Sequence, residues 1–210
     1  YSSSYLQGKR WIAFRVISRT TLNALVFRLA GYKNFFYQGY SLMTFKNFKK
    51  IWDQKREILS SNPDKHAVSV KVDSQLVEGF MSRVMARDFE IVVDQNKGMG
   101  GTNQAPRPSE YVLAALAACQ EVTYRLYADA LDIPLEDVSV SLTGHSDARG
   151  FFGLDDSVRA GFSHVTGEIK IQSSASDNEI ERLQQAVNQH CPVLDDLRNP
   201  VSVKLGLVRK

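Results

Sequence analysis

One stretch of small and apolar residues, residues 105–131, limits how this chain can fold. Pro108 suits the first turn of a helix, because its missing N–H would have no partner there. The apolar side chains that follow recur every three or four residues, as on one face of an α-helix; they are Val112, Leu113, Leu116, Cys119, Val122 and Leu126. Roughly 22 residues at about 1.5 Å each make a rod of about 33 Å, the width of a small domain. The stretch therefore predicts a central helix around which the domain packs.

Small side chains fill the gaps between these apolar positions: Ala114, Ala115, Ala117 and Ala118. A helix that is apolar on most sides is buried on most sides. Because alanine lets a second backbone come close, we expect another helix or a sheet to lie directly against this one.

Alternation of apolar and polar residues predicts β-strands on both sides of the helix. Three are expected before it (68–72, 77–85 and 89–93), two after it (138–142 and 162–171), and a last one at 201–207. A second long helix is expected before the last strand, because Ser176 and Glu179 form a capping-box pattern. The order βββ–α–ββ–α–β predicts an α+β fold with mainly antiparallel strands packed on helices.

Charge is distributed unevenly along the 210 residues. Residues 1–61 carry 11 Lys and Arg against 2 Asp and Glu, a net of +9, whereas residues 62–210 carry 15 against 21, a net of −6. The turn residues of segment 60–64 indicate a linker. We therefore predict a basic N-terminal extension, residues 1–61, followed by a folded domain, residues 62–210.

The extension contains Arg and Ser and has no acidic residue before Asp53, a composition typical of an organelle transit sequence or of a segment just behind one. Residues 44–59 predict an amphipathic helix. Two interpretations remain open: the arm packs on its own domain, or it binds an anionic membrane surface, a large membrane complex or RNA. The second favours a mitochondrial location, with the cytoplasm as the alternative. No apolar run approaches the roughly 18–20 residues of a transmembrane helix.

A Gly-rich loop, residues 95–104, leads into the central helix. Such a loop can hold an anion on its backbone N–H groups. It lacks the spacing and the Lys-Ser/Thr pair of a P-loop, so we favour a flexible entry loop.

The chain has two cysteines, 72 positions apart, which does not fit a disulfide-stapled secreted scaffold. Cys119 lies near the middle of the predicted central helix. It is either a small buried hydrophobic residue or a reactive thiolate. A thiolate there needs a cationic neighbour, because a mid-helix site gains little from the helix dipole.

Cys191 follows the second predicted helix and precedes Pro192, which suits the first position of a short helix over 193–197. Cys191 would then be the N-cap, where backbone N–H groups favour a thiolate. The adjacent His190 also suggests a metal site or a Cys–His nucleophile. Neighbours in sequence usually point apart, however, and no further Cys or clustered His supports a metal. We expect neither a metal nor a cofactor.

Taken together, several motifs resemble the OsmC/Ohr family of thiol-dependent peroxidases. They are the pair Gly100-Gly101, the segment 106–108, Glu110, the run LAALAAC at 113–119, and Cys191-Pro192-Val193 before the last strand. The resemblance covers about residues 66–208 and excludes the extension. It implies an OsmC-like fold and an intertwined homodimer in which the long helices cross and the active sites lie at the interface.

The resemblance also implies roles for individual residues. Cys119 corresponds to the peroxidatic cysteine and Cys191 to the resolving one, acting on organic hydroperoxides. The family holds the thiolate with an arginine from the early strands, for which Arg87 is the best match and Arg83 the second.

Ohr enzymes also place a glutamate ten residues before the reactive cysteine, where this chain has Ser109. Glu110 stands one residue later, as in the broader OsmC-like branch. On a regular helix it lies on the far side from Cys119, so it contributes only if the helix begins later or if it serves the other subunit. The departure at Ser109 and the basic arm leave an alternative: an accessory structural subunit of a larger mitochondrial membrane complex, with weakened or lost activity.

Overall fold

The computed structural model describes residues 48–199 and 201–209. These residues lie in one compact unit that begins at Phe45. In chain order its helices are α2 (Phe48–Ser61), α3 (Pro108–Ala130), α4 (Ala148–Phe151), α5 (Asp177–His190) and α6 (Pro192–Arg198), with short 3-10 turns η2 (Pro63–Lys65) and η3 (Lys97–Met99). Its strands are β1 (Asp73–Glu78), β2 (Met81–Ala86), β3 (Phe89–Val93), β4 (Asp137–His145) and β5 (His164–Gln172). The predicted α+β class and antiparallel pairing are confirmed.

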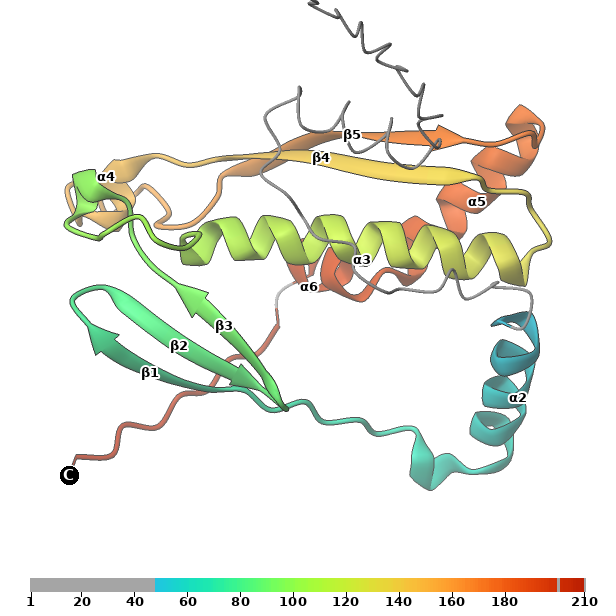
Figure 1. Ribbon diagram of the computed structural model, residues 1–210, viewed down its shortest axis with the longest axis horizontal. Coiled ribbons are helices and arrows are strands. Elements are labelled where there is room, and N and C mark those ends of the chain that lie inside the picture. The colour runs from blue at the N-terminus through green and yellow to red at the C-terminus, as the bar shows by residue number, and fades with distance from the viewer. Residues whose placement is uncertain (1–47, 200, 210) are drawn as a thin grey trace, which may run out of the picture. The chain divides into compact units, whose positions relative to one another are not determined.

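Helix α3 is the central element, as predicted, and it begins at Pro108. The β4–β5 hairpin runs along it, and α5 and α6 also contact it (Figure 1). The core joins Tyr124 and Ala128 of α3 to Leu183 and Val187 of α5, all at most 1% exposed. Burying large apolar side chains is the main driving force for such packing. The α3–α5 contact therefore places the C-terminal end of α5 against α3.

Helix α5 begins where the sequence pattern placed it. The backbone N–H and the hydroxyl of Ser176 donate to Oε2 of Glu179 at 2.9 and 2.7 Å. This capping box satisfies the N-cap groups and holds the first turn.

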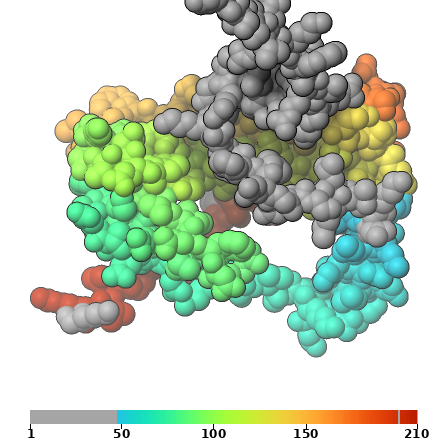
Figure 2. Space-filling model, in the orientation of Figure 1, coloured from blue at the N-terminus to red at the C-terminus, as the bar shows by residue number. Residues whose placement is uncertain are grey.

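The first sheet is a three-stranded antiparallel meander, β1–β2–β3. Two-residue turns join its strands, and the first residue of each turn has a positive φ: 51° at Gly79 and 56° at Arg87. The prediction of one strand over residues 77–85 was wrong, because Gly79 adopts this backbone conformation without steric cost and turns the chain there. The sheet lies at the surface, where β1 is exposed along its whole length (Figure 2).

Two segments expected to be strands, 68–72 and 201–207, have no regular secondary structure in the described chain. Their apolar side chains are open to solvent, for instance Val70 at 97% and Leu205 at 93% exposure. The alternating pattern is present in both, but a strand forms only beside another strand's free backbone groups. Neither segment has such a neighbour within the described single chain.

Helix α2 is the described part of the N-terminal extension, and it packs on its own domain. The ring of Trp52 lies edge-on to Tyr127 of α3, with centroids 5.2 Å apart, and Lys49 forms an ion pair with Asp132. The first of the two interpretations therefore applies to this helix. The Arg-rich stretch that precedes it lies outside the described residues. Among the helices that the structure describes, none has the length and apolar character to cross a membrane.

The Gly-rich loop is organised by the buried carboxylate of Asp94 at the end of β3. This carboxylate accepts hydrogen bonds from the hydroxyl of Thr102 at 2.6 Å and from backbone N–H groups of Gln95, Thr102 and Gln104 at 2.7, 3.1 and 3.1 Å. The side chain of Asn96 accepts a further bond from Met99 N–H at 2.9 Å. The loop thus binds an anionic group of its own chain and is held in place, so the expectation of a flexible loop was wrong.

We predict that Asp94→Ala lowers the free energy of unfolding at neutral pH and makes this free energy less sensitive to acid. The Thr102 hydroxyl, followed by the backbone N–H of Gln104, lowers the pKa of Asp94 to about 2. A lowered pKa in the folded state stabilises the protein above the unfolded-state pKa of about 4, and this contribution is lost as pH falls towards 2. The unfolding free energies of parent and variant, measured in urea, should therefore converge between pH 4 and pH 2.

The exposed Asp156, changed to alanine, is the matched control. A difference between parent and Asp94→Ala that stays constant across this pH range would contradict the assigned role of the carboxylate.

Candidate active site

The structure brings the two cysteines together although 72 positions separate them. The Sγ of Cys191 lies 3.3 Å from the Sγ of Cys119. Cys119 is near the middle of α3 and partly exposed, whereas Cys191 is buried, at 1% exposure. A disulfide has an S–S bond of about 2.05 Å. The two sulfurs are thus free thiols within reach of one another, without any rearrangement of the fold.

Cys191 is held at the junction of α5 and α6. Its backbone N–H donates to the carbonyl of Val187 at 2.9 Å, which completes the last turn of α5. Its own carbonyl accepts from the N–H of Asp195 at 3.0 Å and opens α6, with Pro192 at the first position. The predicted N-cap position of Cys191 is confirmed. Hydrogen bonds on both sides thus hold the backbone of Cys191 at the α5–α6 junction.

Opposing effects act on the thiol of Cys119. Burial is the largest, and it raises the pKa because the charged thiolate loses solvation. The backbone N–H of Val193 donates to this sulfur and lowers the pKa, while the neighbouring thiol of Cys191 raises it. The Thr123 side chain lowers it slightly. The net result is a Cys119 pKa above its ordinary value in the isolated chain.

The contribution of Val193 was not foreseen from the sequence. The N–H groups at the start of α6 were expected to act on Cys191, the N-cap itself. The structure instead directs one of them at Cys119, the cysteine of the facing helix. A mid-helix cysteine thereby receives the help of a helix N-terminus that its own helix does not provide. The only sequence signal for this contribution was the position of Val193 directly after the Cys191-Pro192 pair.

His190 takes part in ring packing. Its imidazole stacks on Tyr127 with centroids 5.2 Å apart and an interplanar angle of 2°. Tyr127 in turn contacts Trp52 of α2, so the ring sits in a short aromatic column.

The two candidate arginines lie on the first sheet. Arg83, within β2, has its Nε 3.8 Å from Oε1 of Glu90 on the neighbouring strand. Arg87 forms the β2–β3 turn, and its guanidinium lies over the ring of Phe89 at 5.2 Å. Arg87 has no carboxylate partner in the part of the chain that the structure describes. Neither arginine is among the groups found to shift the pKa of Cys119 in the single chain.

Glu110 completes a capping box at the start of α3. Its carboxylate accepts from the backbone N–H and from Nη2 of Arg107, both at 2.8 Å, and these bonds lower its pKa. Because α3 begins at Pro108, the possibility of a later helix start is excluded. Glu110 could act in a thiol site only if a second copy of the chain brought it there.

The chain is similar in sequence and in fold to known proteins. The sequence model of the family described as OsmC-like protein matches residues 101–206. Among solved structures, an OsmC-like protein from Mycoplasma pneumoniae is 23% identical, with a TM-score of 0.55 over 63% of this chain and 89% of that one. No curated protein matches this chain.

Two organic hydroperoxide resistance proteins also share the fold. The one from Legionella pneumophila is 23% identical, with a TM-score of 0.50 over 67% of this chain and 96% of that chain. The one from Elizabethkingia anophelis is 19% identical, with the same TM-score over 65% and 92% of the two chains.

We predict that Cys191→Ala lowers the pKa of Cys119. The Cys191 thiol raises this pKa through its hydrogen bond and charge, and the variant removes both. Alkylation of Cys119 by iodoacetamide, followed by mass spectrometry across pH, should shift towards lower pH. A second variant, Thr123→Val, is the control with the opposite expected direction, since Thr123 lowers the pKa. Superimposable curves for parent and Cys191→Ala would contradict the coupling of the two thiols.

Proposed function

This chain belongs to the OsmC-like protein family, and we propose that it is a thiol-dependent peroxidase that reduces organic hydroperoxides through Cys119 and Cys191. The observation that carries the proposal is the 3.3 Å separation of the two sulfurs, one on α3 and the other at the α5–α6 junction. The names of two proteins with the same fold, which are organic hydroperoxide resistance proteins, support the choice of substrate class.

In the first step, the thiolate of Cys119 attacks one oxygen of the hydroperoxide. An S–O bond forms and the O–O bond breaks, which oxidises the sulfur to a sulfenic acid. The alkoxide that leaves takes up a proton and becomes the alcohol. Cys119 suits this role because it is partly exposed, whereas Cys191 is buried.

In the second step, the thiol of Cys191 loses its proton and attacks the sulfenic sulfur. The S–S bond forms, the S–O bond breaks, and the departing hydroxide becomes water. The sulfurs need to approach by roughly 1.3 Å to reach disulfide length, a change that side-chain rotation supplies. The net reaction converts a hydroperoxide and two thiols into an alcohol, water and a disulfide, and an external dithiol then restores the thiols by exchange.

The reaction needs a thiolate, and burial opposes its formation in the single chain. We propose that the chain works as a homodimer in which Arg87 of one subunit lies near Cys119 of the other. Three features support this: Arg87 has no carboxylate partner in the described residues, the three-stranded sheet is open to solvent, and an apolar strip of α3 is exposed. That strip consists of Ala115, Ala118 and Val122. A guanidinium beside the sulfur would lower its pKa by charge and hydrogen bonding.

The alternative, an accessory subunit of a mitochondrial membrane complex, has weaker support. It depends on the extension binding a foreign surface, yet α2 packs on α3 of its own chain through Trp52 and Tyr127. The basic composition of residues 1–44 is the remaining argument for a mitochondrial partner.

We predict that the purified chain, kept reduced by a dithiol, consumes an alkyl hydroperoxide catalytically, and that Cys119→Ser abolishes this. Cys191→Ser should still lose one thiol in a single turnover, because the first step does not need the resolving cysteine. Thiol loss counted in single-turnover experiments distinguishes the two variants. Thiol loss in the parent that is no faster than in Cys119→Ser would refute the proposed peroxidase activity.

We predict that Arg87→Met raises the pKa of Cys119 and slows its alkylation at neutral pH by on the order of tenfold. Arg83→Met is the matched control and should have little effect, because Arg83 already faces Glu90. If Arg87 acts across the dimer, refolding Arg87→Met together with Cys119→Ser should restore fast alkylation in the mixed dimers. A mixture as slow as Arg87→Met alone would argue against a site shared between subunits.

A further inference from the structure

A second site lies beside the thiols on α3. A cavity of about 480 Å³ opens between α3, the β4–β5 hairpin and α6. This volume is within the range of about 300–1,000 Å³ that is typical of small-molecule sites. Neither cysteine lines the cavity. Leu116 and Gln120, one turn apart on α3, line it, so the cavity adjoins the place where the sulfurs meet without including either sulfur.

The side chain of Gln120 is the most informative part of the cavity. The residue is only 4% exposed, and both its Oε1 and its Nε2 are buried with no hydrogen-bond partner among the described residues. Buried amide groups in folded proteins are nearly always paired, because leaving them unpaired is costly. Gln120 lines the cavity, so a polar group bound there would supply the missing partners.

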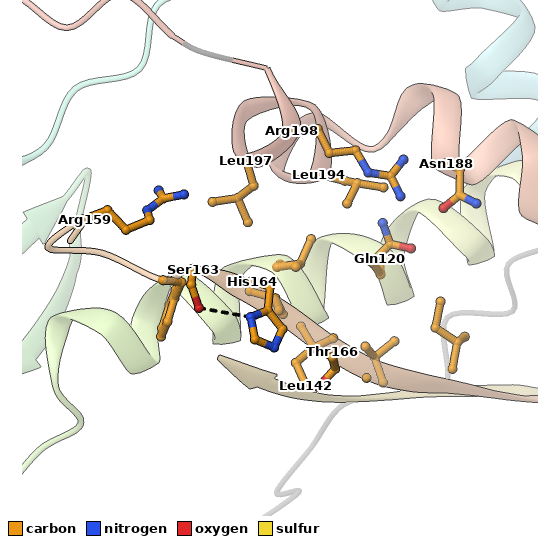
Figure 3. Close-up of a pocket in the computed structure, with 16 residues that line it drawn as sticks. Gln120, Leu142, Arg159, Ser163, His164, Thr166, Asn188, Leu194, Leu197 and Arg198 are labelled. Carbon is orange, nitrogen blue, oxygen red and sulfur yellow. Dashed lines mark hydrogen bonds between the residues drawn. The ribbon is translucent and has the colours of Figure 1, made fainter. Parts of the chain in front are cut away.

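Charge and further polar groups gather near Gln120. Figure 3 shows Arg198 of α6 and Asn188 of α5 towards the same end of the cavity as Gln120, with Arg159 at the opposite end. Neither guanidinium has an ion pair or hydrogen bond with any residue that the structure describes. The remaining wall is largely apolar and includes Leu142, Phe162, Ile169, Leu194 and Leu197.

From this combination we propose that the cavity binds an amphipathic carboxylate, with its carboxylate at Arg198 and Gln120 and its apolar body along the leucine-lined wall. A guanidinium binds a carboxylate through two parallel charge-assisted hydrogen bonds, and an amide N–H adds a third donor. Asp195 and Asp196 share α6 with Arg198, which favours a singly charged head group over a phosphate dianion.

The site is compatible with the proposed dimer. Gln120 is two residues from both Ala118 and Val122, which corresponds to about 200° around the helix. The exposed strip of α3 and the cavity therefore lie on different faces of the helix. A dimer that forms through the strip therefore does not use the face of α3 that lines the cavity.

The test uses the full chain and decanoate, kept below the concentration at which it forms micelles. We expect saturable binding of one decanoate per chain by isothermal titration calorimetry, and at least tenfold weaker binding of decanol, which lacks the charge. Arg198→Gln should weaken decanoate binding by about tenfold or more, while Arg209→Gln, on the exposed C-terminal segment outside the cavity, should leave it unchanged.

A second measurement follows Gln120 directly. Its side-chain amide NMR resonance, assigned by its absence in Gln120→Leu, should shift on addition of decanoate and not of inorganic phosphate. Since Arg198 is exposed, its variant should fold normally, and near-UV circular dichroism checks this. The proposal is overturned if no saturable binding occurs, if decanol binds as tightly, if Arg198→Gln and Arg209→Gln bind equally, or if the amide resonance does not move.

Discussion

The packing of α5 against α3 is the constraint on which the rest of the structure depends. Tyr124 and Ala128 of α3 interlock with Leu183 and Val187 of α5, all almost completely buried. This contact fixes where α5 ends, and the hydrogen bonds around Cys191 then fix where α6 begins. The core packing brings the two thiols to a sulfur separation of 3.3 Å, at which they form a hydrogen bond but no covalent bond.

Electrostatics explain why one chain alone is an incomplete site. Burial makes the Cys119 thiolate costly, and the single N–H of Val193 does not offset that cost. A cation is the missing component, and a turn arginine such as Arg87 can supply it only if another surface brings it there. The exposed β1 strand and the unpaired apolar segment 201–207 indicate that the same surface is needed to complete the sheets. The homodimer proposed above would supply both the cation that activates the thiol and the strand neighbours that the fold lacks.

Sequence patterns predicted what depends on local spacing. The start of α3 at Pro108, the capping box at Ser176 and the N-cap position of Cys191 all follow from rules that act within one turn of a helix. Family membership also followed, because the motifs around both cysteines lie in the matched region.

Contacts between elements that are distant in the sequence could not be predicted from sequence patterns. Periodicity shows that Val70 and Leu205 alternate with polar residues, but not whether another strand lies beside them. Likewise, spacing cannot show that Val193 faces Cys119 from a different helix.

The most direct test of the proposed thiol cycle is peptide mapping by mass spectrometry of the unreduced protein after one equivalent of alkyl hydroperoxide. We expect a disulfide that links Cys119 to Cys191 within one chain. A disulfide between chains, or Cys119 left as the sulfenic acid while Cys191 stays a free thiol, would contradict the proposed cycle.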